Sequence, residues 1–338
     1  MANRVSNQRL VLLSVLGILF LASVGCQRKD ASSVVQRKDP AIGKDGFYKD
    51  NQVLMGTFVE VISPDKRASK IVFAEIQRVE RLMSKYDANS EVARLNSLGS
   101  LKVSPETFAL VKRAKEFWQA SDGAFDITVG PLMELWGFHS KKYYLPREGE
   151  VQKVMPLIGM DKINLDENEF VIQLAVPGMK IDLGGIAKGY AVDCAIAKLR
   201  EAGVESCLIN AGGQIHCLGE NSGNPWKVGV RCPRSDEFCG VIELEDQAVA
   251  TSGDYEQYFI REGKRYSHIL NPKTGYPAQQ GVVSVTVVAP DGVTADALAT
   301  AIFVLGKEKG KELAKQYGRV KVRIITEDEL ESVAKPQD

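Results

Sequence analysis

The stretch KIDLGGIAKGYAVDCAI, residues 180–196, decides how this chain folds around its candidate site. Residues 179–183 read as a short strand, and residues 186–201 read as a helix. Gly184 and Gly185 separate the two elements. Glycine lets a ligand approach the backbone closely, and the start of a helix presents N–H groups to an anion. The stretch therefore predicts a turn that binds a phosphate-bearing ligand, although such a turn can also be purely structural.

The elements around this turn indicate an α+β fold. Helices are expected over residues 69–86, 105–120, 294–305 and 307–317, and one strand over 52–62. Further strands are expected at 207–209, 215–218, 226–230, 241–244, 248–252, 255–260, 266–270, 282–289 and 320–325. Many of these strands are joined by hairpin-length turns and do not alternate regularly with helices. We therefore expect a largely antiparallel or mixed sheet with flanking helices.

The charge balance gives no electrostatic support for a nucleic-acid partner. The 338 residues include 43 Lys and Arg and 43 Asp and Glu, so the formal net charge is zero. A nucleic-acid-binding protein normally carries a basic face, and the charge balance does not support one here.

The amino terminus resembles an export signal. Arg4 and Arg9 precede the apolar run 10–24, which is followed by Gly25 and Cys26. This order is typical of a bacterial lipoprotein signal ending at a lipidated Cys26, with an ordinary secretory signal or an uncleaved anchor as the alternatives. We expect a signal at 1–26, a flexible tether at 27–50, a catalytic domain at 51–330 and a polar tail at 331–338.

Five further cysteines occur, and an odd number cannot all pair within the chain. No Cys-x-x-Cys is present, which disfavours a thiolate zinc site. We expect Cys194, Cys207 and Cys217 to be buried free thiols, whereas Cys232 and Cys239 could form a bridge in an oxidising compartment.

A second candidate element is the stretch APDGVTADALATAIFVLG, residues 289–306. Asp296 is expected in the first turn of a helix, with Thr300 four residues later on the same face. A carboxylate and a hydroxyl so placed are hard oxygen ligands suited to Mg²⁺. Alternatively, Asp296 only complements the helix dipole.

Two other stretches carry polar groups beside turns. His268 is expected in a strand that ends at the turn Asn-Pro-Lys-Thr-Gly, where a lone histidine can be structural or catalytic. Phe125 and Asp126 follow a glycine turn, and an aromatic ring beside a carboxylate can hold a planar ligand and its polar edge. Phe125 can equally be a core residue and Asp126 a cap.

Taken in order, these stretches resemble the FAD:protein FMN transferases of the ApbE family, over residues 52–325. The matching segments are MGTFVEV at 55, MSKYDANSEVARLN at 83, DGAFDITVGPL at 122, DLGGIAKGYAVD at 182, NAGGQI at 210, TSGDYEQYF at 251, SHILNPKTGYP at 267 and ADALATA at 295.

The resemblance implies an ApbE-like fold and transfer of FMN from FAD onto a threonine or serine of another protein, with AMP released and Mg²⁺ required. It also implies acceptors among the flavoprotein subunits of membrane redox complexes, and a lipid-anchored protein on the periplasmic face of a bacterial membrane. No nucleic-acid partner is implied.

Residue by residue, the resemblance implies a catalytic role for His268. It implies Mg²⁺ ligation by Gly185 (through its carbonyl), Asp296 and Thr300. The residues implied to line the FAD site are Met55, Tyr86, Ala124, Phe125, Asp126, Asp182, Lys188 and Leu270.

Two alternative functions remain open on the sequence. The same site could hydrolyse FAD to FMN and AMP with water as the acceptor, or the protein could bind FAD without turnover.

Overall fold

The computed structural model describes residues 41–43 and 46–334. An eight-stranded sheet runs through the centre of this part of the chain, and every neighbouring pair of its strands is antiparallel. Across the sheet the order is β1 (Ala41–Ile42), β2 (Tyr48–Leu54), β3 (Thr57–Ser63), β7 (Cys207–Ala211), β8 (Gln214–Leu218), β11 (Ala248–Gly253), β14 (Val282–Ala289) and β15 (Lys321–Thr326). The predicted α+β class with an antiparallel sheet is confirmed.

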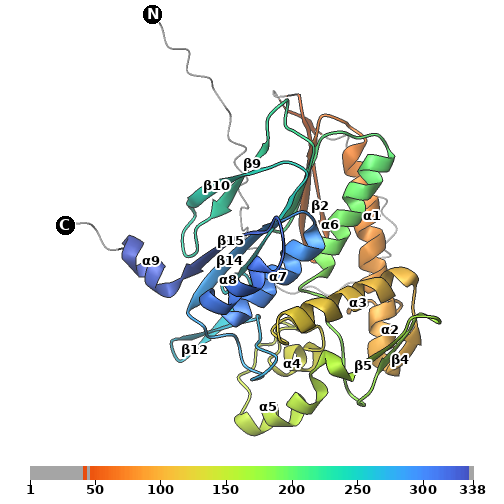
Figure 1. Ribbon diagram of the computed structural model, residues 1–338, viewed down its shortest axis with the longest axis vertical. Helices are drawn as coiled ribbons and strands as arrows, with labels where there is room; N and C mark the ends of the chain where they lie inside the picture. The colour runs from red at the N-terminus through yellow and green to blue at the C-terminus, as the bar shows by residue number, and fades with distance from the viewer. Residues whose placement is uncertain (1–40, 44–45, 335–338) are drawn as a thin grey trace, which may run out of the picture.

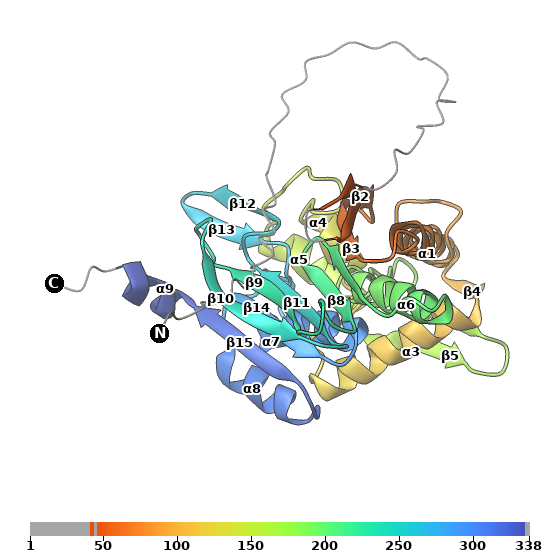
Figure 2. The ribbon, with the colours of Figure 1, turned by 90° about the horizontal axis from the view of Figure 1, so that it is seen from above.

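Helices cover one face of this sheet (Figures 1 and 2). They are α1 (Ala68–Met83), α6 (Ala187–Glu201), α7 (Gly292–Leu305) and α8 (Lys307–Lys315). The hairpin of β9 (Trp226–Arg231) and β10 (Phe238–Leu244) covers the other face through Trp226, Val228 and Leu244. Because both faces are covered, β7, β8 and β14 are buried along their whole length.

Smaller elements surround this core. A three-stranded sheet, in the order β4 (Ser100–Lys102), β6 (Val171–Leu174) and β5 (Ile163–Asp166), packs near α2 (Glu91–Leu98) and α3 (Pro105–Ala120). A separate apolar cluster around Trp136 joins α4 (Gly130–Leu135) and α5 (Glu148–Val154) to the hairpin of β12 (Tyr258–Arg261) and β13 (Lys264–Ser267). Between these elements lie short 3₁₀ turns at Met155–Leu157 and Met160–Lys162, and α9 (Glu327–Ala334) follows β15.

Secondary structure extends beyond both expected limits of the catalytic domain. β2 begins at Tyr48, before the expected start at residue 51, and α9 continues to Ala334, beyond the expected end at residue 330. The expected signal at 1–26, including Cys26, lies outside the described residues. Among the described residues, no helix has the length and apolar character needed to cross a bilayer.

The single strand predicted over residues 52–62 is wrong. The chain turns at Met55 and Gly56, where φ is 50° and 71°, so β2 and β3 form a tight hairpin. Two consecutive residues with positive φ give a turn that matches the twist of the strands it joins. The uninterrupted β-branched and apolar composition on both sides hid this turn, and the Glu80 carboxylate stabilises it by accepting from Met55 N at 2.8 Å.

Two smaller predictions also need correction. Residues 179–183 form only an isolated parallel bridge, Lys180 to Val129, because the segment meets its neighbour over too short a length for a ladder. His268 lies in the bend directly after β13 rather than inside a strand.

Cys232 and Cys239 form a disulfide. Cys194, Cys207 and Cys217 are free, as predicted, although Cys194 is only partly buried.

Helices α6 and α7 cross in close backbone contact. A Cβ atom on Gly189 would collide with the carbonyl group of Gly292, and one on Gly292 would lie 2.6 Å from the Gly189 oxygen. Only glycine therefore permits this approach at either position.

We expect Gly189→Ala to lower the free energy of unfolding by about 1–3 kcal/mol, because the added methyl group forces the two helix starts apart. Gly149→Ala is the matched control, since its new Cβ would meet nothing within 4 Å. Urea unfolding followed by circular dichroism measures both variants. Equal stabilities for the two variants would contradict the packing argument.

Candidate active site

The crossing of α6 and α7 brings together the two segments that the sequence singled out. Gly189 N donates to Asp296 Oδ2 at 3.0 Å, so a side chain of α7 is bonded directly to the first turn of α6. The prediction that Asp296 lies in the first turn of its helix is wrong. It lies in the second turn, because α7 begins at Gly292 with Asp291 as its N-cap. Asp291 caps the helix by accepting from Thr294 N at 2.7 Å, which leaves the Asp296 carboxylate for another purpose.

The three residues predicted to bind a metal ion lie together at this crossing. The position that a Cβ would take on Gly185 is 3.2 Å from Thr300 Oγ1. Thr300 Oγ1 donates to the carbonyl oxygen of Asp296 at 3.3 Å and lies 3.5 Å from Ser252 Oγ. Thr300 and Asp296 therefore share one face of α7, and that face is turned toward the glycine turn.

The donor atoms of this set fit a hard divalent cation. Asp296 supplies a buried carboxylate, Thr300 a hydroxyl and Gly185 a backbone carbonyl, all of them oxygen ligands. Burial raises the pKa of Asp296 above its usual value, with Lys188 acting in the opposite direction. No cluster of three or more His, Cys, Asp or Glu residues suited to a metal occurs among the described residues, and the predicted set contains only one residue of these types.

Asp182 lies just before the glycine turn and helps to shape it. Its Oδ1 accepts from Gly184 N at 2.9 Å, and its Oδ2 pairs with Lys85 Nζ at 2.5 Å. Burial alone would lower the pKa of Lys85, but the Asp182 carboxylate outweighs burial and the pKa is raised. Lys85, which the sequence analysis missed, therefore places a cation beside the predicted FAD residues Asp182 and Tyr86.

The run Ala124-Phe125-Asp126 is buried on the other side of the turn. Phe125 Cε2 lies 3.3 Å from the Cβ position of Gly185, so the aromatic ring borders the glycine turn. Asp126 Oδ1 accepts from the amide and the hydroxyl of Thr128 at 2.7 and 2.5 Å. Burial nevertheless raises the pKa of Asp126 to about 6.

Met55 and Tyr86 lie at the outer side of the site. Met55 occupies the tip of the β2–β3 hairpin, and Tyr86 is 66% exposed. The Tyr86 ring lies 4.8 Å from the His139 ring and 5.1 Å from Lys85 Nζ, measured to the ring centroid. An exposed aromatic ring beside a cation is suited to stacking on a planar ligand.

His268 and Leu270 come from the segment after β13. Leu270 is buried in the cluster around Trp136 and forms an isolated bridge with Pro277. The main-chain nitrogen and Nδ1 of His268 both lie within 3.0 Å of the Gln257 carbonyl oxygen. A carbonyl oxygen only accepts, so Nδ1 carries the proton and Nε2 keeps the lone pair of the neutral ring.

The environment of His268 favours this neutral form. Although part of its surface reaches solvent, the pKa of His268 is lowered to about 4, chiefly because the ring is surrounded by protein, with Lys188 and Lys85 acting in the same direction. Glu256 is exposed as a whole residue, yet the protein around its carboxylate raises its pKa, with Lys188 acting in the opposite direction. The charge of Lys188 therefore acts to lower the pKa values of His268, Asp296 and Glu256. The sequence analysis assigned no role to Glu256, because one carboxylate in a turn carries no distinctive signal.

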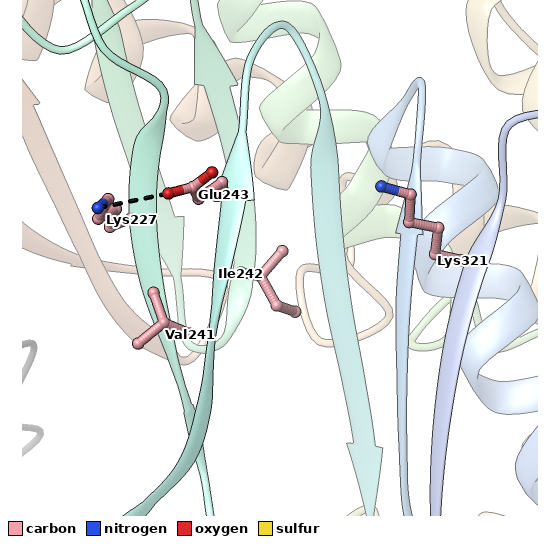
Figure 3. A pocket seen from close by; sticks show the side chains of 5 residues that line it. All are labelled: Lys227, Val241, Ile242, Glu243 and Lys321. Carbon is pink, nitrogen blue, oxygen red and sulfur yellow. Dashed lines mark ion pairs between the residues drawn. The ribbon is translucent and has the colours of Figure 1, made fainter.

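A surface depression elsewhere on the protein lacks these features. It lies on the β9–β10 hairpin, where Lys227 and Glu243 pair at 3.3 Å (Figure 3). Its other lining residues are Val241, Ile242 and Lys321, and none of the predicted site residues belongs to it.

Known proteins resemble this chain over most of its length. A family model described as the ApbE family matches residues 55–324. A FAD:protein FMN transferase of Klebsiella pneumoniae is 36% identical over 86% of this chain and 92% of its own. One of Vibrio cholerae is 38% identical over 73% and 77%, respectively.

Solved structures agree with this assignment. The crystal structure of the ApbE protein of Thermotoga maritima has a TM-score of 0.77 at 36% identity, covering 83% of this chain and 95% of its own. The flavin transferase ApbE of Vibrio cholerae has a TM-score of 0.74 at 31% identity, covering 83% and 93%. The family model spans both the glycine turn and α7, and the relatives match most of the chain. The chain therefore belongs to the ApbE family.

Proposed function

We propose that this protein is a FAD:protein FMN transferase, which moves the FMN part of FAD onto a threonine or serine hydroxyl of another protein and releases AMP. The names of its relatives support this activity. The single observation in the structure that carries the proposal is the meeting of Gly185, Asp296 and Thr300 at the α6–α7 crossing.

The oxygen ligands at this crossing suit Mg²⁺, and Gly185, Asp296 and Thr300 would hold it. When bound, the ion would neutralise the negative charge that develops on the diphosphate oxygens. Gly184 and Gly185 carry no side chains, so a diphosphate can lie against their backbone. Lys188, the second residue of α6, adds a positive charge near the same place.

The reaction needs a base for the acceptor hydroxyl. The hydroxyl oxygen forms a bond to the phosphorus of the FMN half, and the bond from that phosphorus to the bridging oxygen breaks, so AMP leaves with that oxygen. His268 Nε2 carries a lone pair and is our candidate to accept the hydroxyl proton. The exposed Tyr86 and the buried Phe125 and Asp126 would orient the flavin and adenine parts of FAD.

Asp296→Ala should lower the rate of transfer by about 100-fold or more, because it removes the only carboxylate of the proposed metal set. The measurement is the intact mass of a candidate acceptor, a flavoprotein subunit of an ion-pumping NADH:quinone reductase, after incubation with FAD and Mg²⁺. A gain of one FMN unit on a threonine reports transfer. Asp246→Ala, at an exposed aspartate paired with Arg200, is the control and should retain the wild-type rate.

The same assay separates the alternative activities. Rapid AMP release from FAD without an acceptor would favour a pyrophosphatase. Binding of FAD with no AMP release under any condition would favour a non-catalytic flavin-binding protein. Undiminished transfer by Asp296→Ala would remove the proposed metal role.

The pH dependence of kcat/KM for FAD should follow Asp126 and not His268. A histidine with a pKa of about 4 is neutral above about pH 5, so its base form persists through the whole neutral range. Asp126, with a pKa of about 6, ionises within that range and should produce an inflection there. Asp126→Asn should therefore give a flat profile from pH 5.5 to 8. A remaining acid limb near pH 6.5 in that variant would mean that the histidine pKa is not lowered.

Our proposal extends to location: a lipoprotein anchored through Cys26 on the periplasmic face of a bacterial membrane, acting on subunits of membrane redox complexes. The Cys232–Cys239 disulfide supports this location, because such bridges persist in oxidising compartments.

Cys26→Ala should move the protein from the membrane fraction to the soluble fraction of the producing cells, because the site of lipid attachment is lost. Immunoblotting of the two fractions measures the change, and Cys194→Ala is the matched cysteine control. Membrane retention of Cys26→Ala would indicate an uncleaved anchor instead.

A further inference from the structure

Strand β8 contains two polar residues where its surroundings are apolar. Gln214 and His216 are 2% and 4% exposed. Side chains of a strand alternate between its faces, and the neighbours Ile215 and Cys217 pack under the β9–β10 hairpin. Gln214 and His216 therefore point to the helix-covered face, toward the start of α7.

Their partners there are the first turn of α7 and a carboxylate of α6. Asp193 Oδ1 lies 2.8 Å from His216 Nδ1 and accepts from Gly292 N at 2.7 Å, while Oδ2 accepts from Val293 N at 2.9 Å. A carboxylate only accepts, so Nδ1 carries the proton and donates to Asp193. Gln214 Nε2 donates to the Gly292 carbonyl oxygen at 3.4 Å.

This arrangement changes what the amino terminus of α7 can do. Its first N–H groups are bonded to Asp193 and Asp291, so the anion-binding capacity of this helix end is already used within the protein. The two bonds to Asp193 fix the first turn of α7 against α6. Asp296 follows one turn later on α7, and Gly185 precedes α6.

We propose that Asp193, held by His216, is a positioning residue for the metal site: it fixes α7 against α6 and thereby sets Asp296 at its distance from Gly185. The proposal rests on the proposed function, because it assigns a role in that site. Groups behind the ligands of a metal typically alter its affinity by about 10–100-fold when they are changed.

The first test is the binding of Mn²⁺ to Asp193→Asn, measured by electron paramagnetic resonance of the free ion. Mn²⁺ serves as the probe because carboxylate, carbonyl and hydroxyl ligands suit it as they suit Mg²⁺. Asparagine keeps the shape but loses one of the two acceptors, so we expect about tenfold weaker binding. The Mg²⁺ concentration for half-maximal transfer should rise by a similar factor, whereas kcat at saturating Mg²⁺ and FAD affinity without metal should each change less than about twofold.

Glu91→Gln is the matched control. Glu91 also caps a helix from a neighbouring one, since its two oxygens accept from the amide and the hydroxyl of Ser104 at the start of α3, both at 2.8 Å. This variant loses a comparable carboxylate bond away from the site. It should lower stability without changing Mn²⁺ affinity, which separates positioning from a general loss of stability.

His216 provides a second pair of variants in case Asp193→Asn does not fold. His216→Leu removes the donor to Asp193 and should weaken Mn²⁺ binding several-fold, whereas His216→Asn keeps a donor and should restore part of the affinity.

Unchanged Mn²⁺ affinity in Asp193→Asn would overturn the positioning role. If Asp193→Asn does not fold, unchanged affinity in His216→Leu would overturn it. Wild-type protein that binds no Mn²⁺ and transfers no FMN would instead overturn the proposed function, so the two failures are distinguishable.

Discussion

The close crossing of α6 and α7 is the constraint on which the site depends. Gly189 and Gly292 let the two backbones touch, and the bond from Gly189 N to Asp296 holds the side chain of one helix on the first turn of the other. Larger residues at either position would separate the helix starts and, with them, the glycine turn and the polar face of α7.

The sheet beneath this crossing is covered on both faces. Strands β7 and β8 beneath the helices are buried along their whole length, so a polar side chain on them is costly unless it is bonded within the protein. His216 on β8 meets that requirement by bonding to Asp193 of α6, and Asp193 in turn accepts from the start of α7. The bonds that satisfy buried polar atoms are thus the same bonds that fix the geometry of the site.

Local sequence signals predicted the elements well where one signal dominated. The strand Val282–Ala289 and the helix Pro105–Ala120, with Ser104 accepting from Thr107 N at 3.2 Å, match the expectations closely. The turn at Met55 was missed because a non-glycine residue adopts a positive φ there, stabilised by Glu80 from a distant helix. A one-dimensional pattern contains no record of such a partner.

The sequence by itself determined the fold class, the glycine turn, and the spacing that puts Asp296 and Thr300 on one face of a helix. These features depend on residues close together in the chain. Only the tertiary structure decided that this face meets Gly185, that Lys85 pairs with Asp182, and that His268 is kept neutral. These three features depend on contacts between distant segments and on removal from water. Such contacts and such burial cannot be read from the order of residues alone.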